Sequence, residues 1–244
     1  MEYAIIAAGK GERLAQEGAS APKPLTLLNG EPMIDRLLRF FTGLGAGRIH
    51  VIVNESSPAL IGYLKDWQMR AAVHLVVKNT ESSLHSFAAL VASGIRGEVC
   101  LTTVDTVFKE DEFRSLIQSF RAKPHLDGLM AVTSFVDDEK PLYVRTGDRL
   151  KITAFEDSPS AGTSFVSGGI YCLRQRALDL ALSSVDLHVS RMRNYQRALL
   201  ERGLSLEAFP FSRIVDVDHL TDIAVAEELL NTGLIKDPTI TTDL

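Results

Sequence analysis

The chain begins with an apolar run, Tyr3 to Ala8, and continues Gly9-Lys10-Gly11-Glu12-Arg13, with Pro22-Lys23-Pro24 shortly after. This order predicts a strand that ends in a tight turn, because the two glycines are spaced by one residue. The backbone N–H groups of such a turn can face an anion. Arg13 and Lys23 are placed to add two positive charges. The sequence therefore predicts a loop that binds a polyphosphate.

Three known kinds of glycine loop can be compared with this one. A dinucleotide-binding fingerprint needs a third glycine, and Leu14 stands at that position. A P-loop needs a Gly-Lys-Ser/Thr ending, which is absent. An isolated Gly-x-Gly would most simply be a plain turn beside solvated charges. The full pattern of Ala-Ala-Gly-x-Gly-x-Arg followed by Pro-Lys is instead typical of nucleotidyltransferases, which act on nucleoside triphosphates.

The composition limits the classes of protein to which the chain can belong. Its 244 residues, 45% of them hydrophobic, suffice for one sizeable core and fit a single α/β domain. A net charge of −5 argues against a nucleic-acid-binding surface. No run approaches the roughly 20 apolar residues of a membrane helix. Glu2 and Lys10 stand where a signal peptide would need other residues. We expect no nucleic acid and no membrane among the partners.

The two cysteines, Cys100 and Cys172, each lie in an apolar run. This context predicts buried thiols rather than a disulfide. Free thiols are typical of a reducing compartment, so the expected location is the cytoplasm.

Strand-like and helix-like segments alternate through the first half of the chain. Such alternation indicates βαβ units and a mostly parallel sheet. The expected strands span residues 2–8, 49–54, 72–77 and 98–104, and the expected helices span residues 32–43, 57–68 and 82–94.

The second half has a different character, because a hairpin and antiparallel strands are expected there. Residues 143–155 predict the hairpin, with a turn at Thr146-Gly147-Asp148. The remaining expected segments are strands at 127–135, 164–173 and 213–217, helices at 188–202 and 219–231, and a polar, frayed tail at 236–244.

Residues 5–41 resemble the N-terminus of the sugar-phosphate nucleotidyltransferases, which are relatives of the GT-A glycosyltransferase fold. Lys23-Pro24-Leu25 and Asn29-Gly30-Glu31-Pro32-Met33-Ile34 match the family's lysine, short strand, glycine turn and helix start. The resemblance extends over residues 3–230, although only its first segment is highly specific. It implies a three-layer α/β/α fold with a mostly parallel, mixed central sheet.

The same resemblance implies how the chain is organised. One domain, residues 1–244, would contain a nucleotide-binding half at 1–126 and an acceptor-binding half at 127–235. The oligomeric state does not follow from the sequence, and a homo-oligomer is compatible with it.

The resemblance also assigns roles to the residues of the loop. Arg13 and Lys23 would be catalytic: Arg13 would offer a planar fork to pyrophosphate, and Lys23 a point charge to the α-phosphate. The residues expected to bind the nucleotide are Ala7, Ala8, Gly9, Lys10, Gly11, Ser83 and Asp105.

Two aspartates are the candidate magnesium ligands. Asp105 follows the apolar strand Val99 to Val104, and ligands gather outside the carboxyl ends of such strands. Its oxygens suit a hard cation, although a helix cap or turn is the alternative. The resemblance makes Asp105 one ligand of Mg²⁺ and Asp216 the second.

The segment that follows Asp216 predicts the start of the last helix. We expect Asp218 to be the N-cap of that helix. Asp222 would then lie in the first turn, where a negative charge is favourable. His219 is expected at the surface or in a capping role rather than as a metal ligand.

Acceptor-binding residues are implied by the resemblance in the second half of the chain. They are Glu156, Gly168 and Gly169, and the alternative for the glycines is a β-bulge. Ser83 falls in a segment similar to the base-reading segment of choline-phosphate cytidylyltransferases. In this chain Ser82-Ser83 stands where that family has two asparagines. A serine-rich helix start explains that segment equally well.

Two features depart from the family pattern. Asp157 stands where sugar nucleotidyltransferases carry a lysine, which puts a sugar-1-phosphate acceptor in doubt; Arg145, Arg191 or Arg193 could substitute. Eight residues separate Arg13 from Pro22, and we expect this insert to be mobile until nucleotide binds.

The function expected from these residues is Mg²⁺-dependent transfer of a nucleoside monophosphate from a nucleoside triphosphate to a small phosphorylated acceptor, with a sugar-1-phosphate favoured. A choline-phosphate-type or other alcohol-phosphate cytidylyltransferase is the alternative within this class. A glycosyltransferase of the GT-A type would carry a mid-chain Asp-x-Asp, whereas the only such triplet here is Asp216-Val217-Asp218. A non-catalytic relative would be expected to lack one of the four key residues Arg13, Lys23, Asp105 or Asp216.

Overall fold

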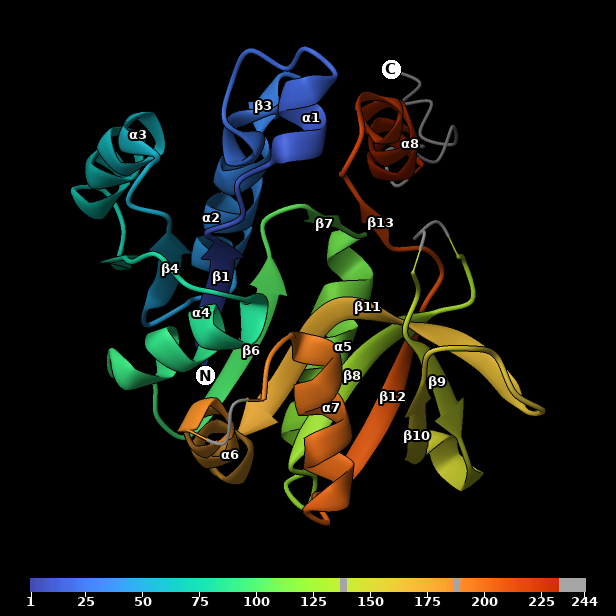
Figure 1. The fold of residues 1–244 in the computed structure, drawn as a ribbon. Coiled ribbons are helices and arrows are strands. Elements are labelled where there is room, and N and C mark those ends of the chain that lie inside the picture. Colours follow the sequence, from blue (N-terminus) through green and yellow to red (C-terminus); the bar gives the residue numbers. More distant parts are fainter. Residues whose placement is uncertain (137–139, 187–188, 233–244) are drawn as a thin grey trace, which may run out of the picture.

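The computed structural model describes residues 1–136, 140–186 and 189–232. Nine of its strands form one mixed sheet with the order β10-β9-β11-β6-β1-β4-β5, and β8 and β12 continue it from β11 (Figure 1). The predicted polar tail at 236–244 lies outside the described residues. Strands from both halves of the chain share this sheet.

The first half builds the parallel part of the sheet, as its alternating pattern predicts. Its strands β1, β4, β5 and β6 pair in parallel. The bounds are β1 (Glu2–Ala7), α1 (Glu12–Gln16), β2 (Leu27–Leu28), β3 (Glu31–Pro32), α2 (Met33–Gly43), β4 (Ile49–Val53), α3 (Pro58–Gln68), β5 (Val73–Val77), α4 (Ser83–Ala92), β6 (Glu98–Thr103), β7 (Thr106–Val107) and α5 (Glu110–Ala122).

The second half adds β11 antiparallel to β6, and the predicted hairpin is confirmed as β9 and β10. Helices α5 and α6 and strand β12 were not predicted, and the helix expected at 188–202 begins at Met192. The bounds are β8 (Gly128–Thr133), β9 (Tyr143–Thr146), β10 (Ile152–Glu156), β11 (Thr163–Arg174), α6 (Gln175–Asp186), α7 (Met192–Glu201), β12 (Leu206–Phe211), β13 (Val215–Asp216) and α8 (Leu220–Asn231).

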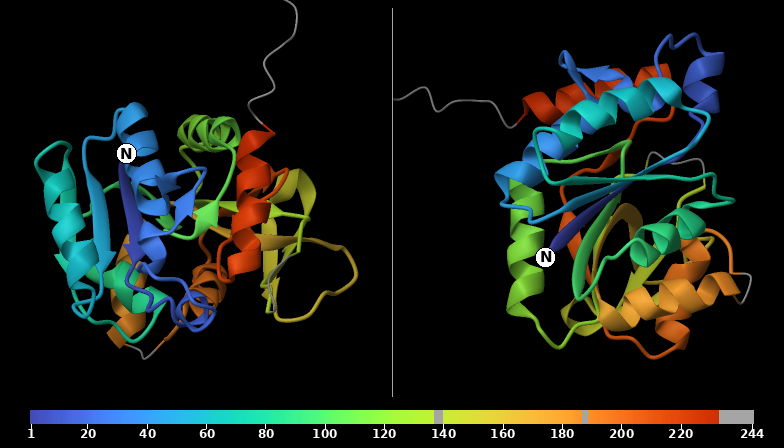
Figure 2. Two further views of the ribbon diagram at one scale, coloured as in Figure 1. Left: turned by 90° about the horizontal axis from the view of Figure 1, so that it is seen from above. Right: turned by 90° about the vertical axis from the view of Figure 1, so that its left-hand side faces the viewer.

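Helices cover both faces of the sheet, which confirms the expected three-layer α/β/α architecture (Figure 2). One core contains apolar side chains of α2, α3, α5 and α8, and the other contains those of α4, α6 and α7. Helix α2 illustrates why the helices pack on the sheet. Its apolar residues fall on one face, and Phe41 on that face stacks on Tyr3 of β1 with ring centroids 4.5 Å apart. Burial of such apolar area is the main stabilising term.

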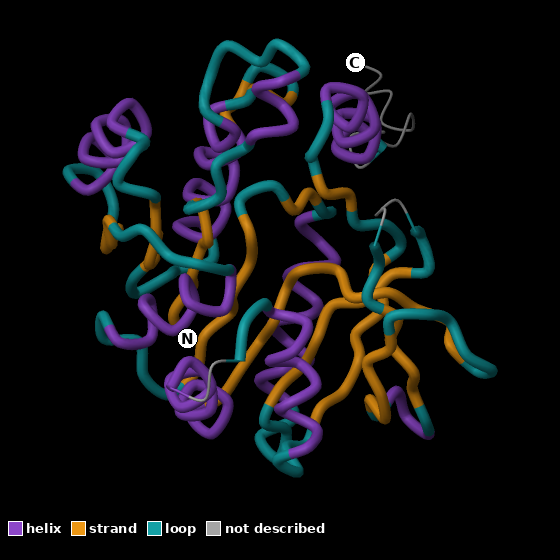
Figure 3. The backbone as a smooth tube through the Cα atoms, in the orientation of Figure 1, coloured by secondary structure: helices purple, strands orange, loops and turns teal. Residues whose placement is uncertain are grey.

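A small strand pair joins the two halves beside the main sheet. The short strands β13 and β7 lie side by side (Figure 3). They run antiparallel, and Asp216 is opposite Thr106. The backbone N–H of Val217 also donates to the carbonyl oxygen of Asp105 at 3.1 Å. The C-terminal segment is thereby fixed against the carboxyl end of β6, next to the end of β1.

The glycines of β11 form a bulge, the alternative considered for them. The pairing of β11 with β8 shifts between Ser167 and Tyr171, and Gly169 has a φ of 74°. A Cβ atom on Gly168 would lie 2.2 Å from Cδ1 of Ile214. The strand is therefore approached closely by the segment that leads into β13.

Cys100 and Cys172 are opposite each other on β6 and β11, and both are buried and free. Burial raises the pKa of the Cys100 thiol. The prediction of buried thiols without a disulfide is confirmed. Among the described residues, no helix is both long and apolar enough to cross a bilayer.

Candidate active site

The glycine loop predicted to bind phosphate leaves β1 and turns at Gly11, which has a φ of 62° and is the N-cap of helix α1. Only glycine adopts this conformation without strain. A Cβ atom on Gly11 would lie 2.8 Å from Cβ of Lys23, whereas one on Gly9 would meet nothing within 4 Å. Gly11 is therefore needed by the protein itself, and Gly9 leaves room above the loop.

The insert between Arg13 and Pro22 is anchored to the rest of the protein, although it was expected to be mobile. Leu14 of α1 is 1% exposed. Glu17 accepts hydrogen bonds from Nδ1 of His219 at 2.5 Å and from the N–H of Leu220 at 2.7 Å. These contacts with the start of α8 could not be foreseen from the insert's small and polar residues.

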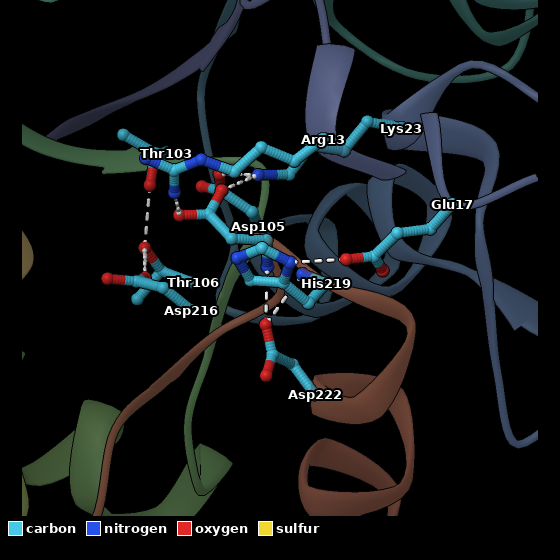
Figure 4. Close-up of polar contacts among 10 residues, drawn as sticks. Arg13, Glu17, Lys23, Thr103, Asp105, Thr106, Asp216, His219 and Asp222 are labelled. Carbon is cyan, nitrogen blue, oxygen red and sulfur yellow. Dashed lines mark hydrogen bonds and ion pairs between the residues drawn. The ribbon is translucent and has the colours of Figure 1, made fainter. Parts of the chain in front are cut away.

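Lys23 lies between two carboxylates. Its Nζ contacts Oδ2 of Asp105 and, at 2.6 Å, Oδ1 of Asp218 (Figure 4). The side chain is only 10% exposed. Burial alone would lower the pKa of Lys23, but the negative charge of Asp105, with Asp218, outweighs it and raises the pKa. The ammonium is thus fixed in its charged form.

Arg13 binds the second carboxylate oxygen of Asp218, the one that Lys23 does not contact. Its Nη1 donates to Oδ2 of Asp218 at 2.9 Å, and its side chain is half-exposed. Partial burial would raise the pKa of Asp218, but the hydrogen bond from Lys23 and the charges around it lower the pKa instead. Asp218 therefore joins the two predicted catalytic cations, a role that the sequence analysis missed.

The N-cap prediction for Asp218 is wrong. His219 is the N-cap of α8 and forms a capping box with Asp222, whose Oδ2 accepts from the backbone N–H of His219 at 2.7 Å. This leaves the side chain of Asp218 free to turn toward Lys23. The capping role of His219 and the first-turn position of Asp222 are confirmed. The Asp-x-Asp spacing was the available signal for Asp218.

Asp216 has a different environment. Its Oδ1 accepts a hydrogen bond from Thr106 Oγ1 at 3.0 Å, and Thr106 Oγ1 is 2.6 Å from Thr103 Oγ1. The carboxylate is accessible to solvent but is surrounded by protein walls. This enclosure and the charge of Asp105 raise the pKa of Asp216 to about 7.

A cleft of about 560 Å³ opens above the loop. It brings together most of the residues predicted to bind the nucleotide. Ala7 is buried in β1 and does not line it. The predicted residues that do line the cleft are Ala8, Gly9, Lys10, Gly11, Arg13, Lys23, Ser83 and Asp105, and Asn54, Thr80 and Asp218 join them.

A second cavity of about 100 Å³ adjoins the cleft and shares Arg13 and Asp218 with it. Asp216 and Gly168 line this cavity. Gly169 and Glu156 do not, and Glu156 accepts from Ser160 Oγ at 2.7 Å.

Asp157, at the position of the family lysine, binds two arginines. Its Oδ1 lies 2.8 Å from Nη2 of Arg197 and 3.0 Å from Nη1 of Arg193. The contact with Arg197 and, to a smaller extent, that with Arg193 lower the pKa of Asp157. Arg193, one of the three arginines considered as substitutes for the lysine, is neutralised by this pair.

The carboxylates around Lys23 suit a hard divalent cation. Asp105 and Asp218 come from distant parts of the chain and converge on one positive charge. Where the structure describes the chain, no three His, Cys, Asp or Glu side chains gather as a metal site. Mg²⁺ is commonly held by one or two carboxylates together with substrate phosphates, so this donor set fits it.

A model of the MobA-like NTP transferase domain matches residues 3–167. The chain belongs to this family. It is 31% identical over 115 residues to a 2-aminoethylphosphonate cytidylyltransferase of Lancefieldella rimae, and that match covers 44% of this chain and 44% of the relative. The chain therefore matches less than half the length of this relative.

Solved structures of the same fold include proteins that are named as nucleotidyltransferases. An inositol-1-phosphate CTP transferase from T. maritima has a TM-score of 0.76 at 14% identity, covering 95% of this chain and 96% of that one. A Bacillus anthracis structure described as a putative glucose-1-phosphate thymidylyltransferase has a TM-score of 0.79 at 18% identity, covering 94% of each chain. HddC from Yersinia pseudotuberculosis has a TM-score of 0.70 at 18% identity, covering 93% and 98%. At these identities the likeness confirms the fold.

Proposed function

We propose that this nucleotidyltransferase moves a nucleoside monophosphate from a nucleoside triphosphate to a small acceptor that carries a phosphate or phosphonate. The observation that carries this proposal is the cluster of Arg13, Lys23, Asp105 and Asp218, at the edge where the large cleft adjoins the small cavity. The cleft has room for a nucleotide, and the cavity lies within reach of its phosphates. Residues 1–126 would bind the nucleotide and residues 127–235 the acceptor, within one domain.

The reaction needs positioning and charge neutralisation rather than a covalent intermediate. An oxygen of the acceptor attacks the α-phosphorus, the bond from that phosphorus to the bridging oxygen breaks, and pyrophosphate leaves with the electron pair. The N–H groups between Gly9 and Gly11 bind phosphate oxygens. Lys23 neutralises the α-phosphate, and Arg13 neutralises the departing pyrophosphate.

The cluster also offers a place for the metal. We propose that Asp105 and Asp218 hold Mg²⁺ when the nucleotide displaces Lys23 from between them. Asp216, the second ligand expected from the sequence, lines the other cavity and contacts Thr106, so we assign its metal role to Asp218. A divalent cation held there would supply further neutralisation of phosphate charge.

The acceptor is proposed to be a small phosphonate or alcohol phosphate, with CTP as the nucleotide. The relative named for 2-aminoethylphosphonate supports this choice over a sugar-1-phosphate. Asp157 supports it as well, because it replaces a cation by an anion that holds Arg193 and Arg197. A sugar-1-phosphate remains the second candidate because solved structures of the same fold carry sugar-phosphate names.

We also propose that the protein works in the cytoplasm. Cys100 and Cys172 are opposite each other on neighbouring strands, yet they are free thiols. Free thiols are typical of proteins in a reducing compartment, which supports this proposal.

Pyrophosphate release tests the function. The protein is mixed with Mg²⁺ and each nucleoside triphosphate in turn, together with 2-aminoethylphosphonate, phosphocholine or a sugar-1-phosphate. We expect release with CTP and a non-sugar acceptor, and its loss in Asp105→Asn. Asp66→Asn is the matched control. Asp66 is exposed on α3, so this substitution removes the same charge at a position outside the cleft. No release with any pair would contradict the proposal.

A further inference from the structure

The small cavity beside the nucleotide cleft has polar and apolar walls. Its apolar lining comes from Phe135, Pro141, Val166 and Ile214. Its volume of about 100 Å³ is less than a fifth of that of the cleft. A sugar ring would bring several hydroxyl groups against these walls, and buried hydroxyls without partners are costly.

Most polar side chains in the cavity already have partners. Thr133 Oγ1 accepts from the N–H of Phe135 at 3.1 Å, and Ser167 Oγ donates to Gln196 Oε1 at 3.1 Å. Asp222 accepts from two backbone N–H groups at the start of α8. Each of these two hydroxyls therefore has one protein partner, and the carboxylate of Asp222 caps the start of α8.

The other ionisable groups at the border of the cavity, Asp218 and His219, also have partners. Both oxygens of Asp218 are bound, one by Arg13 and the other by Lys23. His219 is bound by Glu17. Asp216 is different, because its Oδ1 accepts from Thr106 while its Oδ2 has no partner among the described residues. It also forms no ion pair with any of them, and its contact drawn in Figure 4 is the one with Thr106.

We propose that Asp216 is the acceptor-specificity residue and binds an ammonium group at the far end of a short aminoalkyl phosphonate or phosphate. The free carboxylate oxygen would accept a charge-assisted hydrogen bond from the ammonium, which has only donors to offer. The apolar walls would contact the short carbon chain between the two charged ends. The acidic end of the acceptor would face the nucleotide cleft, which the cavity joins at Arg13 and Asp218.

This inference rests on the proposed function, so its test must separate the two. The wild-type protein is assayed for pyrophosphate release with CTP and either 2-aminoethylphosphonate or 2-hydroxyethylphosphonate, which differ in their charge at the far end. We expect the amino acceptor to have a kcat/KM at least about 100-fold higher, as a site built for one polar partner discriminates strongly. Comparable values for the two acceptors would overturn the assignment while leaving nucleotidyl transfer intact.

Asp216→Asn then tests the residue itself, with Asp66→Asn as the control. We expect the amino acceptor's KM to rise about 10- to 100-fold, which is the effect of losing one charge-assisted hydrogen bond. Turnover of the hydroxy acceptor, the affinity for CTP and the Mg²⁺ requirement should change little. Equal loss with both acceptors, accompanied by a raised Mg²⁺ requirement, would make Asp216 a metal ligand and contradict the proposal. Absence of all release in the wild type would instead count against the proposed function.

Discussion

The nucleotide cleft and the small cavity beside it differ in how their charges are balanced. In the cleft, Lys23 and Arg13 are both bound to carboxylates, so the positive groups are already held in place. In the cavity, Asp216 has a hydroxyl donor and no cation among the described residues. The cations of the cleft are thus already paired with carboxylates, whereas Asp216 has no such partner among the described residues, although Arg13 also lines its cavity.

The same comparison explains why two aspartates only two residues apart have opposite properties. Asp218 has a lowered pKa because cations surround it, and Asp216 has a raised pKa because protein walls and Asp105 surround it. Position in the chain does not decide the role. The role of each aspartate is decided by the residues that it contacts after folding, which come from β7, the end of β6 and the loop that follows β1.

Removing Lys23 should have the largest effect on the cleft. We expect Lys23→Ala to reduce kcat by about 10²- to 10³-fold, as is found when one group that stabilises transition-state charge is lost. The control Lys65→Ala removes an exposed lysine of α3. Steady-state kinetics with CTP measure the loss, and a thermal melt checks that the fold persists. Near-normal kcat in a folded Lys23→Ala protein would break the assignment of the cleft as the catalytic site.

The two loop glycines should respond differently to substitution. Gly11→Ala places a Cβ atom against Lys23 in a left-handed conformation, so we expect a loss of about 1–2 kcal/mol in stability and reduced kcat. Gly9→Ala meets no protein atom within 4 Å. It should leave the melting temperature unchanged and weaken CTP binding, measured by calorimetry. Unchanged CTP affinity in Gly9→Ala would show that phosphates do not lie over Gly9.

The acceptor cavity should be affected by Gly168→Ala without the cleft being affected. The added Cβ atom would displace Ile214, and overpacking of this kind costs about 1–3 kcal/mol. We expect a higher KM for the acceptor and an unchanged affinity for CTP. If CTP binding weakens instead, the two cavities do not have separate ligands.

The smallest effect is expected at the contact that anchors α1. The hydrogen bond with His219 lowers the pKa of Glu17, and that with Glu17 raises the pKa of His219 above 6.5. A lowered carboxyl pKa adds stability that is lost as pH falls through it, and a raised imidazole pKa adds stability that is lost as pH rises through it. The Glu17–His219 ion pair therefore stabilises the protein fully only at pH values between the lowered pKa of Glu17 and the raised pKa of His219.

An NMR titration of His219 measures this contact. In Glu17→Gln the pKa of His219 should fall toward its ordinary value, and the catalytic parameters should change little. A His219 pKa that is the same in both proteins would mean that the insert is not held by this contact in solution.

The sequence predicted the parallel half of the sheet and the phosphate loop because the relevant signals are local. Alternating apolar segments gave β1, β4, β5 and β6, and the glycine spacing placed the loop after β1. Helices α5 and α6 were missed although α5 has a clear apolar face and three acidic residues in its first turn. These features of α5 are local and could therefore have predicted a helix there.

The long-range contacts could not be predicted in the same way. Asp218 is 195 residues from Lys23 and 205 from Arg13, so no local pattern reveals the bridge. The capping preference of aspartate favoured Asp218 as the N-cap, but His219 and Asp222 formed the capping box and left Asp218 for the cations. The division of labour between Asp216 and Asp218 emerges only when β13 pairs with β7.

Phosphorus NMR of the complete reaction tests the central claim most directly. The protein would be incubated with CTP, Mg²⁺ and 2-aminoethylphosphonate. We predict that the resonances of CTP disappear together with that of the free phosphonate, and that pyrophosphate and a new phosphonate–phosphate anhydride appear in equal amounts. The same incubation is repeated with phosphocholine and with a sugar-1-phosphate. Unchanged CTP with all three acceptors, or release of orthophosphate without a new anhydride, would contradict cytidylyl transfer to a phosphorylated acceptor.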